Sequence, residues 1–541
     1  MPRKGTVLLR WTVMLTALLL GLSLVTPPVA EARASVAAVP AITWSGCSDP
    51  ELAYYELQCG TLEVPLDRAD PSGPMIRLAL TRKQHTAPFK GVLLTNPGGP
   101  GGSGLTLPGL SDYVPGNVGA SYDWIGFDPR GVGSSTPSLH CIRGYFGYDR
   151  PTYVPRKARV QRYWLAKSRS YAAACATTAA RRRLLAHLTT LDTVRDMESI
   201  RQALGAAKLN YYGLSYGSYL GELYATRYPT RVGRFVLDGV VDPARAWYAF
   251  NLDQDRAMEV SMDAFWHYLA AHPGTFHLGR HSRAVKRGYY RTLRRLGRRP
   301  AAGGRLGPDE TSDVMLDAGY YVYNWASLGR AYSQLVRHRR GAAILSLYRD
   351  SAMGDDNSFA VYNAVECSDA TWPGLARTRQ DSWSTHRRAP FLTWNNTWYN
   401  APCLFWHAPH RAKPTVSGGA VTAKMLLISE TRDAVTPYAG ALAVRRLFPT
   451  ASLVAGVGGT THASSLSGVA CVDNAMASYL RTGIVPTRVS GTRFDRGCPR
   501  VPPPPAWAGG GRRTTANTAT PVDKMPPMLR RDLAEAQRSG R

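Results

Sequence analysis

The feature that most constrains this chain is the pentapeptide Gly213-Leu214-Ser215-Tyr216-Gly217, the only G-x-S-x-G in its 541 residues. It follows the strand-like run Asn210–Gly213 and precedes the helix-like run Ser218–Tyr228. A serine on such a strand-to-helix turn has strained backbone angles, so its neighbours have to be small. The helix that begins there directs its N-terminal amides toward negative charge that develops beside the serine. The pentapeptide therefore predicts a nucleophile, Ser215, at the carboxyl end of a strand.

Strand-like and helix-like runs alternate on both sides of this turn. The strand-like runs are Met75–Leu80, Gly91–Thr95, Ser121–Phe127, Phe235–Asp238, Lys424–Ser429 and Ser452–Val457. The further helix-like runs are Lys157–Leu204, Tyr438–Leu447 and Cys471–Arg481. Such alternation predicts an α/β fold, with a mostly parallel sheet that carries helices on both faces.

Differences in composition divide the chain into five parts. We expect a signal peptide over residues 1–34 and the first part of the α/β core over 35–243. Residues 244–415 lack the alternation and are rich in Tyr, Trp, His and Arg, so we expect a large helical cap there. The core then resumes over 416–500. Residues 501–541 are rich in Pro, Gly, Thr and Arg, which predicts a disordered tail.

The N-terminus indicates export. Arg3, Lys4 and Arg10 flank or precede the apolar run Trp11–Val25, and Ala32-Arg33-Ala34 has the small residues of a cleavage site. A membrane anchor is the alternative, because the run could nearly span a bilayer. The small residues favour cleavage, so we expect a secreted, extracellular protein without stable membrane insertion. Association with a cell wall stays open.

Eight cysteines accompany the predicted export, and none of them has the C-x-x-C spacing of a metal or redox site. An even number in oxidising surroundings predicts disulfides, although sequence alone leaves the connectivity open. Neighbours in order make the least demanding set, namely Cys47–Cys59, Cys141–Cys175, Cys367–Cys403 and Cys471–Cys498.

The chain is strongly basic, with 66 Lys and Arg against 38 Asp and Glu and a formal charge of +28. A nucleic-acid partner has to be considered, because a basic surface attracts phosphate. The arginines are scattered through predicted helices, as at Arg181–Arg183 and Arg294–Arg295, without interleaved aromatic residues. We therefore expect a solvated basic surface and no nucleic-acid partner. Such a surface favours anionic surroundings, for example a cell wall.

An activated serine needs a base, and the base needs an acid that orients it. In a strand-to-helix arrangement of this kind the chain order is serine, acid, histidine. His462 is the only histidine after Asp433, and both follow predicted strands, where ligands meet open α/β sheets. The alternatives are a loop histidine at 462 and a helix-capping acid at 433, with Asp238 or Asp242 as the orienting acid.

The glycine-rich loop Asn96–Gly104 follows a predicted strand and is a candidate oxyanion hole. A phosphate cradle is the alternative, but the loop has no G-K-[ST] and no dinucleotide-binding spacing. We expect the amides of Gly99 and Tyr216 to be the two donors. A histidine cluster between His267 and His281 matches no common metal-ligand spacing, so we expect no metal and no cofactor.

The chain resembles the tripeptidyl aminopeptidases, secreted relatives of the prolyl aminopeptidases within the α/β-hydrolases. The resemblance runs from about residue 44 to 500. The matching motifs are Cys59–Asp67, Asn96–Gly104, Asp128–Ser135, Gly213–Gly217, Val236–Pro243 and Asp433–Pro437. It implies the α/β-hydrolase fold, a triad of Ser215, Asp433 and His462, and release of tripeptides from free N-termini. We expect a monomer that acts on peptides.

An aminopeptidase must neutralise the ammonium group of its substrate, so an acid should lie beneath the cap. Glu366 and Asp369 are the candidates, with Glu222 behind them, and solvated or ion-paired acids are the alternative reading. The expected function is a serine exopeptidase that works through an acyl-enzyme. The alternatives are a carboxylesterase or lipase-like hydrolase, which uses the same triad, and a catalytically silent surface binding protein.

Overall fold

In the computed structural model, the structure describes residues 41–506. The predicted signal peptide and most of the predicted tail lie outside these residues. Within them, no helix is both long and apolar enough to cross a bilayer.

The described residues form one ten-stranded sheet, with strand order β1-β2-β3-β5-β4-β6-β7-β8-β9-β10. The strands are β1 Ser45–Gly46, β2 Gln58–Pro65, β3 Met75–Lys83, β4 Val92–Asn96, β5 Asp123–Phe127, β6 Leu209–Leu214, β7 Val232–Asp238, β8 Met425–Glu430, β9 Ala451–Val457 and β10 Arg496–Pro499. From β5 to β10 all neighbours are parallel, and only the β1-β2-β3-β5 edge is antiparallel. The predicted α/β class with a mostly parallel sheet is confirmed.

Burial explains why the central strands form where they do. Every residue of β4, β6 and β8 is buried, and these strands are mostly apolar, as expected for parallel strands covered on both faces. Helices outside the insertion between β7 and β8 connect strands of the sheet. They are α1 Pro50–Tyr54, α3 Ala179–Leu185, α4 Thr190–Ala203, α5 Tyr216–Arg227, α15 Ala439–Leu447 and α16 Ala470–Thr482.

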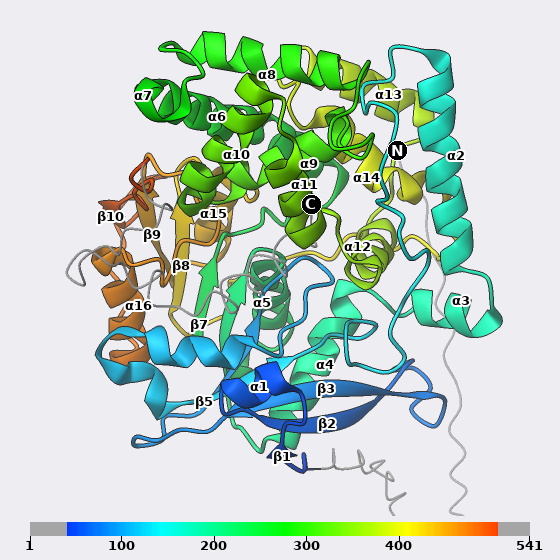
Figure 1. Cartoon of the computed structure of the whole chain (residues 1–541). Coiled ribbons are helices and arrows are strands. Elements are labelled where there is room, and N and C mark those ends of the chain that lie inside the picture. The colour runs from blue at the N-terminus through cyan, green and yellow to red at the C-terminus, as the bar shows by residue number, and fades with distance from the viewer. Residues whose placement is uncertain (1–40, 507–541) are drawn as a thin grey trace, which may run out of the picture. The chain divides into compact units, whose positions relative to one another are not determined.

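The described elements between β7 and β8 are all helices (Figure 1). The helices are α6 Tyr248–Ala271, α7 Pro273–Phe276, α8 Ser282–Leu296, α9 Pro308–Tyr320, α10 Trp325–His338, α11 Ala342–Leu347, α12 Asp356–Asp369, α13 Leu375–His386 and α14 Thr393–Asn400. Helix α2, Ala158–Cys175, precedes β6 in sequence but packs beside these helices, where Trp164 stacks on Trp398 of α14. Helix α2 therefore packs against helices that lie far from it in sequence.

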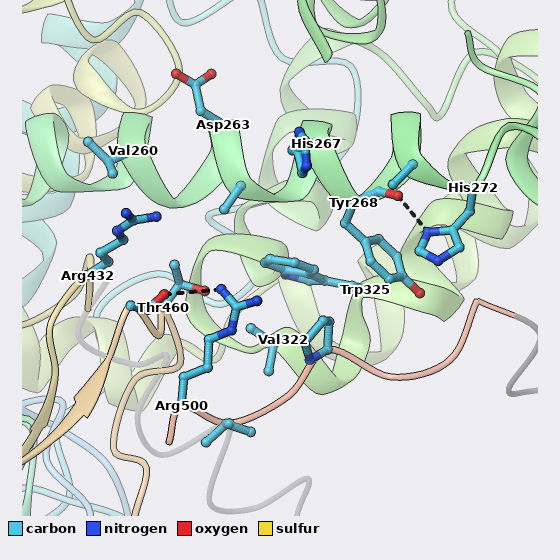
Figure 2. Close-up of a pocket in the computed structure, with 15 residues that line it drawn as sticks. Val260, Asp263, His267, Tyr268, His272, Val322, Trp325, Arg432, Thr460 and Arg500 are labelled. Carbon is cyan, nitrogen blue, oxygen red and sulfur yellow. Dashed lines mark hydrogen bonds between the residues drawn. The ribbon is translucent and has the colours of Figure 1, made fainter. Parts of the chain in front are cut away.

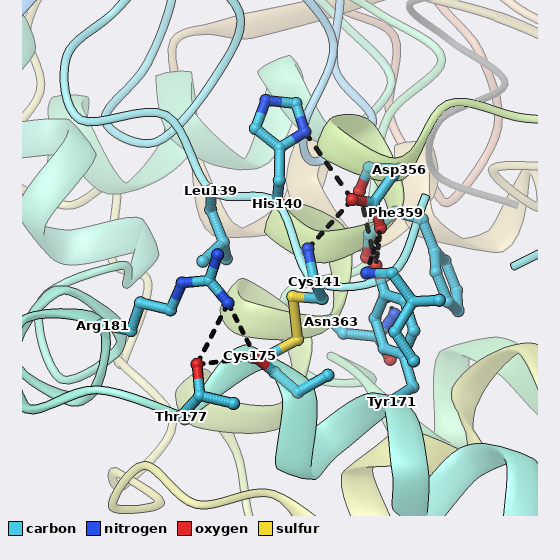
Figure 3. The surroundings of a disulfide bond; sticks show 12 residues. Leu139, His140, Cys141, Tyr171, Cys175, Thr177, Arg181, Asp356, Phe359 and Asn363 are labelled. Atoms are coloured by element: carbon cyan, nitrogen blue, oxygen red, sulfur yellow. Dashed lines mark hydrogen bonds and ion pairs between the residues drawn. A yellow bond between two sulfur atoms is a disulfide. The ribbon is translucent and has the colours of Figure 1, made fainter. Parts of the chain in front are cut away.

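The eight cysteines form four disulfides, each between neighbours in sequence: Cys47–Cys59, Cys141–Cys175, Cys367–Cys403 and Cys471–Cys498. Figure 3 shows the second of them at the end of α2. Asp356, at the start of α12, accepts hydrogen bonds there from the amide of Cys141 at 2.9 Å and from the Tyr171 hydroxyl at 2.9 Å. Together the disulfide and the carboxylate fix α2 against α12. Four disulfides agree with an oxidising, extracytoplasmic compartment.

Residues 501–506 correct the prediction of a disordered tail from residue 501. The amide of Val501 donates to Glu430 Oε1 at 2.7 Å, at the end of β8. The carbonyl of Pro504 accepts from the Tyr268 hydroxyl on α6, and that of Ala506 accepts from Arg330 on α10. The composition, rich in Pro, Gly, Thr and Arg, predicted disorder, but the carbonyl groups of Pro504 and Ala506 accept hydrogen bonds from side chains of α6 and α10.

Candidate active site

Ser215 lies on the turn between β6 and α5 and has φ 57° and ψ −125°. Positive φ is strained for a residue with a side chain. The turn is tight enough to need glycine on both sides, because a Cβ on Gly213 would lie 2.4 Å from the carbonyl oxygen of Gly217. A Cβ on Gly217 would lie 2.7 Å from the carbonyl oxygen of Asn96. The sequence pattern and the local geometry therefore agree at this turn.

His462 and Asp433 are in direct contact. The imidazole Nδ1 lies 2.9 Å from Asp433 Oδ2, and both side chains are fully buried. The other carboxylate oxygen accepts from the amides of Val435 at 2.8 Å and Thr436 at 3.1 Å. The Thr436 hydroxyl also donates to Oδ2 at 2.9 Å. These donors hold the carboxylate in one orientation, which in turn holds the ring.

The opposite nitrogen of the ring, His462 Nε2, is buried and has no hydrogen-bond partner within residues 41–506. The Ser215 hydroxyl is thus not bonded to it in this conformation, as is common before substrate binds. Asp238 and Gly239 connect the two residues, since the Ser215 amide donates to the Asp238 carbonyl at 2.9 Å. A Cβ on Gly239 would lie 2.8 Å from His462 Cε1. Ser215 and His462 therefore both lie against the carboxyl end of β7.

The two alternative orienting acids do not contact the histidine. Asp238 Oδ2 accepts from the amide of Ser465 at 2.6 Å and from its hydroxyl. Asp242 accepts from the amide of Ala244 at 2.9 Å. Of the three acids considered, only Asp433 is placed to orient His462.

The glycine-rich loop after β4 touches the serine turn. A Cβ on Gly98 would lie 2.8 Å from Ser215 Cβ and 2.9 Å from the Tyr216 amide nitrogen. Gly98 itself donates to Asn96 Oδ1 at 2.9 Å, so its amide is occupied. Tyr216 is the first residue of α5, where an amide has no carbonyl within the helix to bond to. Gly98 thus brings the glycine-rich loop, which includes the predicted donor Gly99, against Ser215 and the Tyr216 amide.

Asp128, which follows β5, shapes this loop and was not predicted to have a role of its own. One oxygen accepts from the Ser103 hydroxyl at 2.6 Å and the Gly104 amide at 3.2 Å, and the other accepts from the Ser134 amide at 2.8 Å. Burial raises the pKa of Asp128 to about 6, against the lowering effect of these hydrogen bonds. The only sequence signal was its place in one of the family motifs.

Glu430 was also missed. Its Oε2 accepts from the Thr461 amide at 2.5 Å, one residue before His462, while Oε1 accepts from Val501. A Cβ on Gly459 would lie 2.1 Å from the Glu430 carboxyl carbon, so the histidine loop closes over this side chain. Burial raises the pKa of Glu430 to about 8. Sequence gave no signal, because the partners of Glu430 are backbone amides.

A cavity of about 650 Å³ lies beside the histidine loop, between that loop and α6 (Figure 2). Arg432, Thr460 and Arg500 line it from the core, and His267 and Trp325 line it from the cap. Trp325 is 5% exposed and thus belongs to the core as well as to the wall of this cavity. Residue Tyr320 reaches the site itself, since its carbonyl accepts from the His462 amide at 2.8 Å. Within the described residues, no group of three potential metal-ligating side chains occurs.

The three candidate amine-binding acids are buried. Glu366 on α12 accepts from Asn251 Nδ2 at 3.1 Å, and burial raises its pKa to about 8. Helix α12 passes over the glycine-rich loop, because a Cβ on Gly101 would lie 2.5 Å from the carbonyl oxygen of Ser358. Glu222 on α5 has two buried oxygens without partners in the described part of the chain, and burial raises its pKa well above the usual value.

Asp369 is the most firmly bonded of these acids. It accepts from the Thr190 amide at 3.0 Å, from the Thr190 hydroxyl, and from Trp247 Nε1 at 3.4 Å. The same threonine hydroxyl lies 2.8 Å from the hydroxyl of Tyr216. Asp369 therefore braces the residue that follows the nucleophile, and its oxygens have less capacity for a ligand than those of Glu366.

The carboxyl ends of the central parallel strands carry a strained serine, a buried histidine–aspartate pair and a glycine-rich loop. This combination defines a serine hydrolase of the α/β-hydrolase class. Residues 389–492, which include Asp433 and His462, match the family model described as TAP-like protein. The chain is 36% identical over 471 residues to a tripeptidyl aminopeptidase of Streptomyces lividans, covering 84% of this chain and 86% of that protein. The chain belongs to the tripeptidyl aminopeptidase family.

Two further relatives from Mycobacterium tuberculosis are similar over most of their length. One is named serine protease Hip1 and is 30% identical over 474 residues, covering 82% of this chain and 89% of the relative. The other is named carboxylesterase B and is 30% identical over 502 residues, covering 87% of this chain and 95% of the relative. Family membership and enzyme class, a serine hydrolase with peptidase relatives, are therefore as predicted.

Proposed function

We propose that this protein is a secreted exopeptidase that releases tripeptides from free N-termini through an acyl-enzyme. The observation that carries the proposal is the contact between His462 and Asp433 beside the strained turn of Ser215. The similarity to a protein named tripeptidyl aminopeptidase supports the substrate class.

In this mechanism the Ser215 hydroxyl attacks the scissile carbonyl carbon while His462 Nε2 takes its proton. Asp433 holds the ring and stabilises the imidazolium. The amides of Gly99 and Tyr216 donate to the oxyanion of the tetrahedral intermediate. His462 then gives its proton to the leaving amine as the C–N bond breaks. A water molecule, deprotonated by the same nitrogen, attacks the acyl-enzyme and releases the tripeptide.

Glu366 is the proposed anchor for the substrate's ammonium group. Its carboxyl is buried on a helix that crosses the glycine-rich loop, and it is less fully bonded than Asp369. The ammonium of a bound substrate would favour the ionised carboxylate and so offset the effect of burial on its pKa. Glu222 is the reserve candidate, because its carboxylate oxygens have no partners among the described residues.

Residues 244–415 are the proposed cap, which limits access to short or N-terminal segments of a peptide. The proposed boundaries leave 35–243 and 416–500 as the two parts of the core. We also propose that the mature protein is a monomer and that its basic surface keeps it at the cell wall.

The test compares chromogenic tripeptides with and without an N-terminal acetyl group. Ser215→Ala should abolish fluorophosphonate labelling and lower kcat by roughly four to six orders of magnitude. Glu366→Gln should lower kcat/KM about 10- to 100-fold for the free amine, since a hydrogen bond to a charged group contributes about 1.5–3 kcal/mol, and should leave the acetylated peptide unaffected.

Asp369→Asn is the matched control, because it should reduce hydrolysis of both peptides alike by disturbing Tyr216. An unchanged preference for the free amine in Glu366→Gln would exclude Glu366 as the anchor, and labelling that survives in Ser215→Ala would exclude Ser215 as the nucleophile.

Carboxylester hydrolysis is the second candidate function, favoured by the 30% identity to a protein named carboxylesterase B. The same triad serves both reactions. A short acyl ester included in the substrate panel separates them. A kcat/KM for the ester that exceeds that of every tripeptide would favour the esterase.

A further inference from the structure

A second cavity, of about 800 Å³, lies in the cap between α8 and the segment that leads into α2. Arg156, Lys157 and Arg159 line it on the α2 side. Arg287, Arg291, Arg294 and Arg298 line it on the α8 side. We call this cavity and its two cationic walls the α8 groove. Figure 1 shows α8 at the end of the cap that faces away from the strands.

The arginines on α8 form a row for a clear reason. The helix buries Val285, Tyr289, Thr292 and Leu296, whose spacing of three and four residues places them on one face. Arg287, Arg291 and Arg294 repeat at the same spacing, two positions later, and are all exposed. From Arg287 to Arg294 the row is about 10 Å long at 1.5 Å per residue.

None of these seven cations forms an ion pair within residues 41–506. The acid that lines the groove is Asp309, which is buried, and burial raises its pKa well above the usual value. By contrast, Arg150 in the nearby interior pairs with Asp313 at 2.8 Å and Glu310 at 3.3 Å. The fold thus neutralises the buried cation and leaves the groove positive.

We propose that the α8 groove binds an extended polyanion built of phosphodiester-linked sugar or polyol units. The row of arginines is too long for one phosphate to touch both ends, so the ligand carries several charges. This site is separate from the proposed active site, because none of Ser215, Asp433 and His462 lines it.

A single-stranded nucleic acid is the competing ligand and is less well matched. Nucleic-acid grooves offer aromatic faces on which bases stack. The rings of Tyr289, Phe391 and Trp394 in this groove are at most 9% exposed, and of the other rings that line it only Tyr290 and His386 are partly exposed. The seven cations thus outnumber the rings on which a base could stack, which favours a polymer without bases.

The test measures fluorescence anisotropy of labelled synthetic poly(glycerol phosphate), with single-stranded DNA of equal charge as the comparison. Wild-type protein should bind the poly(glycerol phosphate) more tightly than the DNA. Affinity should fall steeply between about 50 and 200 mM salt, because counterions are released. Arg291→Gln with Arg294→Gln should weaken binding at least tenfold and reduce the salt slope by roughly 0.7 to 0.9 per charge removed.

Arg283→Gln with Arg299→Gln is the matched control, because both arginines are exposed and neither lines the groove. This control should change the affinity less than twofold. An equal loss in both double variants would overturn the proposal in favour of diffuse charge attraction. Tighter binding of the DNA would overturn it in favour of a nucleic-acid partner. Unchanged peptide hydrolysis in the Arg291 and Arg294 variant serves as the folding control.

Discussion

Single carboxylates, rather than the triad alone, set the geometry of this site. Asp433 orients His462 directly, Glu430 holds the backbone just before the histidine, and Asp128 holds the glycine-rich loop. Glu430 is the last residue of β8, Asp433 follows it, and Asp128 follows β5, so the ends of rigid strands fix the positions of these side chains. The loops around Ser215 and His462 are thus held by buried acids.

Replacing Glu430 by Gln should lower kcat about tenfold or more and change KM little. One amide oxygen cannot accept from both Thr461 and Val501, so one buried N–H loses its partner, at a cost of about 1–3 kcal/mol. Steady-state kinetics with the free-amine tripeptide measure the change. Glu63→Gln, on an exposed position of β2, is the control and should leave both constants unchanged. A pure rise in KM would show that Glu430 does not act through His462.

For single residues, the sequence predicted the candidate triad better than the residues that hold its loops in place. The order serine, acid, histidine selected Ser215, Asp433 and His462, and the structure brings the last two into contact. Chain order could not discard Asp238, which required the observation that Ser465 occupies its carboxylate. Glu430 could not be predicted, since its partners are backbone amides that any sequence possesses.

Helix α12 connects the helices inserted between β7 and β8 with the loops around Ser215. Its first turn is held by Asp356 beside Cys141 and contacts the glycine-rich loop at Ser358, and its end carries Glu366 and Asp369. The disulfide Cys367–Cys403 fastens this last turn to the chain after α14. The position of both acids therefore depends on one covalent link.

Removing that link with Cys367→Ser and Cys403→Ser should raise KM for free-amine peptides more than it lowers kcat. It should also reduce stability by about 2–4 kcal/mol, since it opens a loop whose ends are 36 residues apart. Thermal unfolding and kinetics on the same preparation report both effects. Cys47→Ser with Cys59→Ser is the control, and should lower stability without moving KM. An equal rise in KM in the two double variants would show that the disulfide at α12 has no specific effect on substrate binding.

The elements that short stretches of sequence determine were predicted correctly. The buried runs that became β4, β6 and β8 lie within a residue or two of their predicted ends, because continuous apolar runs are read directly from sequence. Strand β10 and the packing of α2 beside the cap were missed. Both depend on long-range partners, β9 and α14 respectively, which no window of sequence contains.

Across the whole molecule, buried acids make stability depend on pH. Burial raises the pKa of Asp255 to about 7, and those of Glu366 and Glu430 to about 8. A raised folded-state pKa means that the unfolded chain loses its proton first as pH increases. The stability that these acids contribute is complete below about pH 4, where they are protonated in both states, and is lost as pH rises through 7 to 8.

The free energy of unfolding should therefore fall between about pH 5.5 and pH 8.5, and Asp255→Asn should reduce that fall. One pKa unit corresponds to about 1.4 kcal/mol, so the difference is on the order of a few kcal/mol. Denaturant unfolding at the two pH values measures it. Asp253→Asn is the control at a partly exposed, ion-paired position of the same helix and should keep the wild-type slope. A slope in Asp255→Asn parallel to that of the wild type would contradict the assignment.

Residues 501–506 give the molecule a mechanical connection between its two halves. They bond to α6 and α10 of the cap at one end and to Glu430 at the other. The second oxygen of the same carboxyl holds the backbone before His462. A tilt of α6 and α10 away from the sheet would therefore strain these hydrogen bonds and, through Glu430, the backbone just before His462.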